Sequence, residues 1–175
     1  MSSTLKVDYI EGRTGDTPIY NGYELDQWRL DADDTTDGNH TLTNWERVDD
    51  ATSTKIGTGM SVSSGIFSFP RTGTYLVSLN ATIHVATADS FAAIECLVAT
   101  DGSSFDDATA YASVGGDGET NSYLSSAVQF IFNCTNTSTH VVSFKTNSIH
   151  NDNYVSGNSG YSYTHVTFER KGPSQ

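Results

Sequence analysis

The sequence predicts an all-β domain, a sandwich or jelly roll of antiparallel strands. Two patterns carry this prediction. Apolar and polar residues alternate with a period of two from about residue 65 onward, and clusters of Gly, Asn, Asp and Ser separate the alternating runs. Helical periodicity is absent from almost the whole chain. Charged residues make up only 17% of the chain, against about 25% in a typical domain, so hydroxyl and amide groups dominate the polar surface.

The first 23 residues differ from the rest. A short extended run is followed by a turn at residues 14–16 and a second apolar group, and the segment is too short to fold alone. We therefore expect an extended N-terminal arm at residues 1–23 that docks on another surface, followed by one domain at residues 24–175. The arm's apolar contacts are expected from Leu5, Val7, Tyr9 and Ile10.

The longest alternating run covers residues 75–85, with apolar side chains at odd positions and polar ones at even positions, as in a half-buried strand. Further strands are predicted at 92–100, 124–134, 142–146 and 164–170. Segments rich in Gly, Asn, Asp and Ser predict turns at 99–107, 115–121 and 148–160. Cys96 and Cys134 both fall on faces predicted to point inward, which fits either two buried thiols or a bridge between neighbouring strands.

Residues 64–75, SGIFSFPRTGTY, resemble the centre of the C1q/TNF-like jelly roll. In this interpretation Pro70 closes a strand, Gly73 makes the turn, and Phe67 and Tyr75 pack between the sheets. Upstream, Trp28–Leu30 and the NWERV segment at 44–48 resemble the family's first two strands. The resemblance implies an antiparallel C1q/TNF-like sandwich that assembles as a homotrimer.

The sequence also offers candidate subunit contacts. Apolar side chains are few for an isolated monomer, since hydrophobic residues make up 36% of the chain. Several apolar residues fall on faces predicted to point outward: Leu76, Tyr123, Ile131, Tyr161 and Tyr163. The alternative interpretation is that these are scattered surface side chains, or that one strand is out of register.

The N-terminal segment STLKVDYIEGRTG resembles a segment that opens structural proteins of marine tailed phages, which often also carry a pair like Trp28–Leu30 and Trp45–Glu46. This resemblance implies a virion protein whose arm attaches to a major capsid or tail protein. Two roles stay open: a capsid decoration, cement or head-fibre protein, and a tail-fibre tip that binds a host receptor.

Charge and motifs exclude several other functions. Nine Lys and Arg against 21 Asp and Glu give a net charge of −12, which argues against binding nucleic acid or an anionic membrane. No apolar stretch is long enough for a membrane span, and the start lacks the features of a signal peptide. The motifs of hydrolases, zinc proteases and nucleotide-binding loops are missing. We therefore predict no catalytic residues and no enzymatic activity.

Two polar segments are candidate binding sites. Calcium is the possible ligand of an acidic cluster at residues 31–37, through Asp31, Asp33 and Asp37. The spacing does not fit a calcium-binding EF-hand, so we expect a solvated loop and no cofactor. A host glycan is the possible ligand of the segment 148–160, through His150, Asn151, Asp152, Asn153 and Tyr154. An ordinary polar loop is the other interpretation of this segment.

Overall fold

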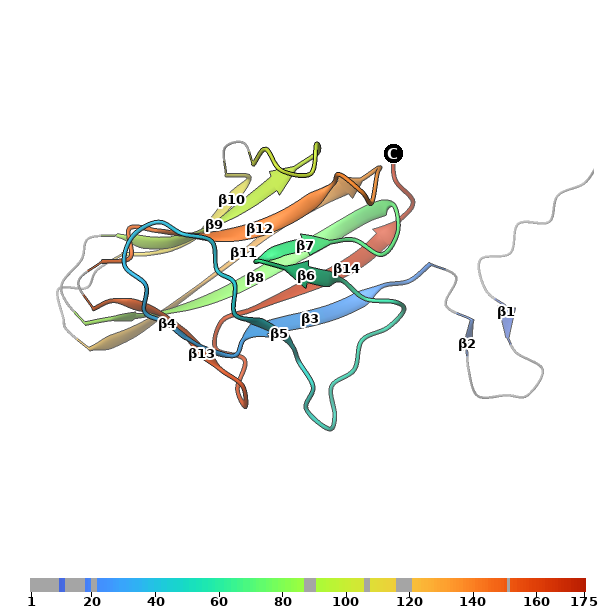
Figure 1. Cartoon of the computed structure of the whole chain (residues 1–175). Coiled ribbons are helices and arrows are strands. Elements are labelled where there is room, and N and C mark those ends of the chain that lie inside the picture. Colours follow the sequence, from blue (N-terminus) through green and yellow to red (C-terminus); the bar gives the residue numbers. More distant parts are fainter. Residues whose placement is uncertain are drawn as a thin grey trace, which may run out of the picture.

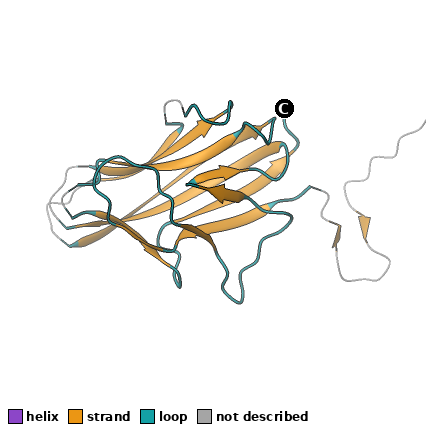
Figure 2. Cartoon of the chain, viewed as in Figure 1, coloured by secondary structure: helices purple, strands orange, loops and turns teal. Residues whose placement is uncertain are grey.

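Two antiparallel β-sheets face each other and form the body of the molecule (Figure 1). The computed structural model describes residues 22–86, 91–105, 108–115, 121–150 and 152–175, and the backbone of residues 10–11 and 18–19. All regular structure in these residues is β-strand (Figure 2), so the described chain contains no helix able to span a membrane.

The first sheet has five strands in the order β10 (Ala110–Val114), β9 (Ala92–Ala99), β12 (Val141–Asn147), β7 (Ile66–Ser68) and β6 (Ser61–Ser63). The second has seven strands around β8 (Gly73–Val85). One edge of β8 pairs with β11 (Ser122–Cys134), and the other with β14 (His165–Gly172) and β13 (Tyr154–Asn158). Beyond these lie β3 (Leu25–Leu30), β5 (Trp45–Arg47) and β4 (Ala32–Asp34). In the arm, β1 (Ile10–Glu11) pairs with β2 (Pro18–Ile19).

Alternation along β8 determines which of its side chains enter the core. Tyr75, Val77, Leu79 and the following odd-numbered residues are buried, whereas the even-numbered ones are half-buried on the opposite face. This confirms the predicted strand and its two faces. All thirteen residues of β8 pair in register with β11, from Gly73 with Cys134 to Val85 with Ser122.

Aromatic rings fill the space between the sheets, centred on Phe67. Its ring lies 5.5 Å from that of Trp28, 5.6 Å from Trp45, 5.8 Å from Phe144 and 5.0 Å from Phe168. These rings come from both sheets, so Phe67 joins the two layers. The prediction that Phe67 and Tyr75 pack between the sheets is confirmed, since both are fully buried.

Two glycines of the resembling segment have different structural roles. Ser64 and Gly65 both have positive φ, 50° and 77°, and form the two-residue turn between β6 and β7. Gly73 was expected to make a turn, but it is the first residue of β8. A Cβ at Gly73 would lie 2.8 Å from the carbonyl oxygen of Gly172, so this glycine permits a close approach of β14 instead.

Two segments predicted as loops contain strands. The turn-rich region 148–160 includes β13, and the acidic segment 31–37 includes β4, which pairs with β13. The glycine at position 157 allows β4 to lie this close to β13, because a Cβ there would collide with the carbonyl of Ala32 on β4. Buried Val155 and Ser156 face protein on both sides of β13. These strands could not be predicted from the sequence, because Asn, Gly and Asp are rare in strands.

Cys96 and Cys134 are buried free thiols, so of the two alternatives the bridge does not form. They lie in different sheets, on β9 and β11. Burial raises the pKa of Cys96 to about 12 and also raises that of Cys134. Both side chains therefore act as small apolar core residues rather than as reactive groups.

Candidate functional site

The outward face of β8 and β11 carries large exposed apolar side chains. Tyr123 and Ile131 point outward from β11 and are 62% and 70% exposed. Tyr161 and Tyr163 precede β14 and are also exposed, with ring centroids 6.2 Å apart. The Thr82 hydroxyl on β8 donates to the Tyr163 carbonyl, which places this segment beside the same face. The structure thus gathers Tyr123, Ile131, Tyr161 and Tyr163 on one side of the sheet. Leu76, the fifth predicted contact residue, is half-buried on the outward face of β8. Contact of these residues with another subunit stays a prediction.

An aromatic cluster of His84, Tyr123 and Tyr154 lies at one end of this face. The His84 ring stacks on Tyr154 at 4.5 Å between centroids and meets Tyr123 edge-on at 4.8 Å. The two tyrosine hydroxyls are 3.2 Å apart. Their hydrogen bond, followed by burial, raises the pKa of Tyr154 to about 12, so Tyr154 is neutral at physiological pH.

A depression lies at the centre of the face. Ser78 and Asn80 of β8 and Ala127 and Gln129 of β11 line a depression of about 360 Å³. The depression lies along β11 between Tyr123 and Ile131. A side chain from another molecule could enter it and meet hydroxyl and amide groups.

Both sheets end in an unpaired edge on the same side of the sandwich. Among the described strands, β11 pairs only with β8 and β10 pairs only with β9, and β10 contacts β11. Two further exposed aromatic residues, Phe91 beside β9 and Tyr111 on β10, belong to this edge strand and its neighbour. Neither residue could be predicted from the sequence, because only the strand order shows that β10 is an edge.

A buried arginine occupies the outward side of β3. Arg29 is 1% exposed, and its guanidinium contacts carboxylates of Glu46 at 2.7 Å, Asp49 at 2.9 Å and Asp50 at 3.2 Å. The hydrogen bond with Glu46 is the main cause that raises the pKa of Arg29, and it outweighs the desolvation that would lower it. The cluster ties the segment after β5 to β3, and it supplies no unpaired cation for chemistry.

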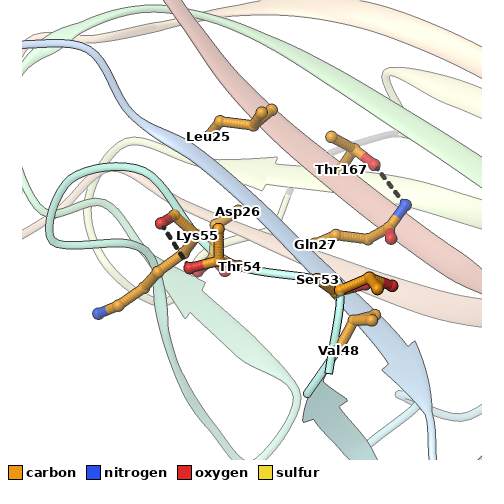
Figure 3. Close-up of a pocket in the computed structure, with 9 residues that line it drawn as sticks. Leu25, Asp26, Gln27, Val48, Ser53, Thr54, Lys55 and Thr167 are labelled. Carbon is orange, nitrogen blue, oxygen red and sulfur yellow. Dashed lines mark hydrogen bonds between the residues drawn. The ribbon is translucent and has the colours of Figure 1, made fainter. Parts of the chain in front are cut away.

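The same segment covers a polar groove of about 290 Å³ (Figure 3). Leu25 and Val48 contribute apolar surface, and Gln27 of β3 donates to the hydroxyl of Thr167, its partner on the adjacent strand β14, at 3.1 Å. The remaining lining is mainly hydroxyl-bearing: Thr52, Ser53 and Thr54, with Lys55 beside them. Such a mixture suits a small polyhydroxylated ligand.

The polar side chains of the predicted glycan segment are divided between buried and exposed positions. Asn153 is buried, and its side-chain oxygen accepts from the backbone N–H of Ala86 at 2.7 Å, which anchors the segment to the end of β8. Tyr154 belongs to the aromatic cluster. His150 and Asp152 are exposed, and Asn151 lies outside the described residues.

The acidic cluster is divided between structural tasks. Asp33 accepts from the backbone N–H of Gly157 at 2.9 Å, and Asp34 contacts His40 at 2.9 Å. Asp31 and Asp37 are exposed. Within the described ranges, no group of three or more His, Cys, Asp or Glu side chains is placed to hold a metal ion. Calcium binding by Asp31, Asp33 and Asp37 stays an untested alternative.

The base of the arm is fixed to the last strand. Arg170 on β14 donates from its side chain to the carbonyl of Gly22 at 2.7 Å and from its backbone N–H to that of Glu24 at 2.8 Å. The Tyr23 hydroxyl donates to Glu169 at 3.1 Å. Of the predicted attachment residues, Ile10 opens β1, and Leu5, Val7 and Tyr9 lie outside the described residues.

Comparison with known proteins identifies the fold. No protein-family model matches the chain, and no curated protein matches its sequence. A crystal structure of murine APRIL at pH 5.0 superposes with a TM-score of 0.60 at 14% identity, over 85% of this chain and 98% of that one. The structure of Eiger TNF from S. frugiperda gives 0.63 at 7% identity, over 87% and 95%. The predicted C1q/TNF-like jelly roll is therefore confirmed as the fold.

Proposed function

We propose that this chain is a non-enzymatic structural protein of a virion, a homotrimeric surface knob attached through its N-terminal arm. The main support for a trimer is that the edge strands β10 and β11 are both unpaired beside an exposed apolar face. The thirteen-residue edge strand β11 presents Tyr123 and Ile131 with no covering segment among the described residues. Natural proteins protect long edges of this kind, and a second subunit would do so here.

Replacing Ile131 with lysine should weaken this assembly. Ile131 is 70% exposed in the single chain, so Ile131→Lys leaves the core intact while placing a charge in the proposed contact. We expect the full chain to sediment as a trimer. The dissociation constant of the variant trimer should be at least about tenfold higher. Thr43→Lys, at an exposed position between β4 and β5, is the matched control. A monomeric full chain, or an unchanged variant, would refute the proposed interface.

The arm supports attachment to the particle through its resemblance to virion proteins. Deleting residues 1–20 leaves the contacts of Gly22, Tyr23 and Glu24 with β14 in place. We therefore expect a folded trimer that no longer joins particles assembled from the remaining virion proteins. Circular dichroism and sedimentation check the knob, and co-purification with particles checks attachment. A truncated protein that still joins normally, or a knob that unfolds, would contradict the role of the arm.

The copy number of the protein per particle distinguishes its two possible locations. Decoration of a capsid, or a role as cement or head fibre, requires many copies bound to the major capsid protein, whereas a tail-fibre tip requires few. Of the two locations, we propose the capsid. Counting copies in a particle reconstruction tests this choice.

A second candidate function is binding of a host glycan, and the groove between β3 and the segment after β5 favours it. Its size suits one sugar ring, with Leu25 beneath and hydroxyl and amide groups around. Methyl glycosides of glucose, galactose and mannose should then bind weakly in saturation-transfer NMR. Thr54→Val should reduce the signal, whereas Thr43→Val outside the groove should not. Equal signals from both variants, or none from the unmodified chain, would exclude this groove.

A further inference from the structure

Two arginines converge at the base of the N-terminal arm. Arg71 precedes β8 and Arg170 lies near the end of β14, at the end of the sandwich where β3 begins (Figure 1). A Cβ placed on Gly22 would lie 3.0 Å from a terminal guanidinium nitrogen of Arg170 and 3.8 Å from one of Arg71. Two cations therefore lie beside one backbone position of the arm's base.

Arg170 is held in place without a carboxylate. Its Nε donates to the carbonyl oxygen of Thr72 at 3.0 Å, and a terminal nitrogen donates to that of Gly22 at 2.7 Å. Within the described residues, no Asp or Glu side chain forms an ion pair with Arg170. Carbonyl oxygens orient the guanidinium without cancelling its charge, and its second terminal nitrogen keeps N–H groups for a ligand.

Arg71 has one carboxylate partner, which is fully engaged by the protein. Nε of Arg71 donates to Oε1 of Glu24 at 2.7 Å, and Glu24 is 2% exposed whereas Arg71 is 42% exposed. Oε2 of Glu24 accepts from the backbone N–H of Gly59 at 2.9 Å. The two arginines therefore carry two positive charges against one buried negative charge, and the terminal nitrogens of Arg71 stay open to a ligand.

The charge of this arginine pair, Arg71 and Arg170, is unusual on an acidic molecule. Lys171 and Glu169 beside it form their own ion pair at 2.7 Å. The chain as a whole has a net charge of −12, so the long phosphate backbone of a nucleic acid would be repelled by the surrounding surface. A single carboxylate fits better, because the planar guanidinium of arginine binds a carboxylate through two parallel hydrogen bonds.

We propose that the arginine pair binds an acidic side chain of the virion protein to which the arm attaches. This inference rests on the proposed function and specifies the chemistry of the partner surface. The terminal nitrogens of the two guanidiniums donate to the oxygens of one Asp or Glu carboxylate. Because the pair lies at the base of the arm, this contact orients the knob on the particle, and the arm provides the remaining attachment.

A carboxylate added beside the arginine pair should compete with the partner. Thr72 is exposed, follows Arg71 and accepts from Arg170 through its backbone carbonyl. Thr72→Glu therefore keeps both arginines and offers them an internal carboxylate. We expect the protein concentration for half-maximal binding to particles assembled from the remaining virion proteins to rise at least about tenfold. Circular dichroism should show an unchanged fold.

Two control variants separate the added charge from its position. Thr72→Gln has nearly the same shape as Thr72→Glu but no charge. Thr43→Glu adds the same charge at an exposed position between β4 and β5. Both should bind particles like the unmodified chain.

A cross-linking measurement identifies the partner group. Arg71→Lys keeps the positive charge and supplies an amine, which a carbodiimide couples to a nearby carboxylate as an amide. We expect mass spectrometry of bound particles to find position 71 joined to an Asp or Glu of the virion protein. The guanidinium of the unmodified chain does not react and serves as the control. Position 71 joined only to Glu24 of its own chain, or to nothing, would overturn the proposal.

The outcomes separate this inference from the proposed function. If the unmodified chain does not join particles, the proposed function and the inference fail together. If it joins and Thr72→Glu joins equally well, the arginine pair lies outside the contact and the proposed function stands. A loss in Thr72→Gln or Thr43→Glu as large as that in Thr72→Glu would also refute the site, because the effect would then not come from a carboxylate beside the arginines.

Discussion

Replacing Arg29 with methionine is expected to lower the free energy of unfolding by about 2 kcal/mol, because charge-assisted hydrogen bonds are lost while the carboxylates that remain are partly hydrated. Methionine has a similar length but no charge, and Arg29 is 1% exposed. The substitution leaves the carboxylates of Glu46, Asp49 and Asp50 close together without their common cation. The segment after β5, which these contacts tie to β3, should loosen as well. Chemical denaturation at a fixed subunit concentration measures the change, because association also contributes to apparent stability.

Lys171→Met provides the matched control. Lys171 contacts Glu169 at 2.7 Å, the same separation as Arg29 and Glu46, but the lysine side chain is 48% exposed. An exposed pair contributes at most about 1 kcal/mol, so the two substitutions test burial at equal distance. Similar small losses in both variants would show that the Arg29 cluster does not hold β3 and its neighbouring segment together.

The Arg29 cluster also illustrates what the sequence could not predict. Its carboxylates come from β5 and the residues after it, and they meet Arg29 only because β3 and β5 pair with Arg29 opposite Glu46. Local alternation predicts which residues of a strand point inward, but not which side chains a later segment will cover. The outward position of Arg29 would ordinarily be solvent-exposed.

Other parts of the fold could be predicted because their signal is local. The alternation in β8 is unbroken over thirteen residues, so strand and faces follow directly. In β13 the signal is weak, because Ser156 and Gly157 occupy buried positions that apolar residues usually fill. The aromatic cluster could not be predicted from local patterns. His84, Tyr123 and Tyr154 come from three strands, and only the pairing register of those strands brings them together.

Phe67→Ala is expected to cost about 3–5 kcal/mol in the free energy of unfolding, the largest effect of any single substitution considered for this chain. Phe67 is fully buried, and its ring meets those of Trp28, Trp45, Phe144 and Phe168 at centroid distances of 5.0 to 5.8 Å. These four rings cannot close the space left by truncation without moving a strand, because they come from both sheets. Thermal and chemical unfolding should both report the loss.

Phe91→Ala is the matched control, because it also removes a phenyl group but does so outside the core. Phe91 is 42% exposed beside β9, so its truncation in the single chain leaves no enclosed cavity, and we expect a loss of at most about 1 kcal/mol. Equal losses in the two variants would mean that Phe67 does not join the sheets. A large loss for Phe91→Ala that disappears under dissociating conditions would instead locate Phe91 in the subunit contact, because only an assembled neighbour could bury its ring.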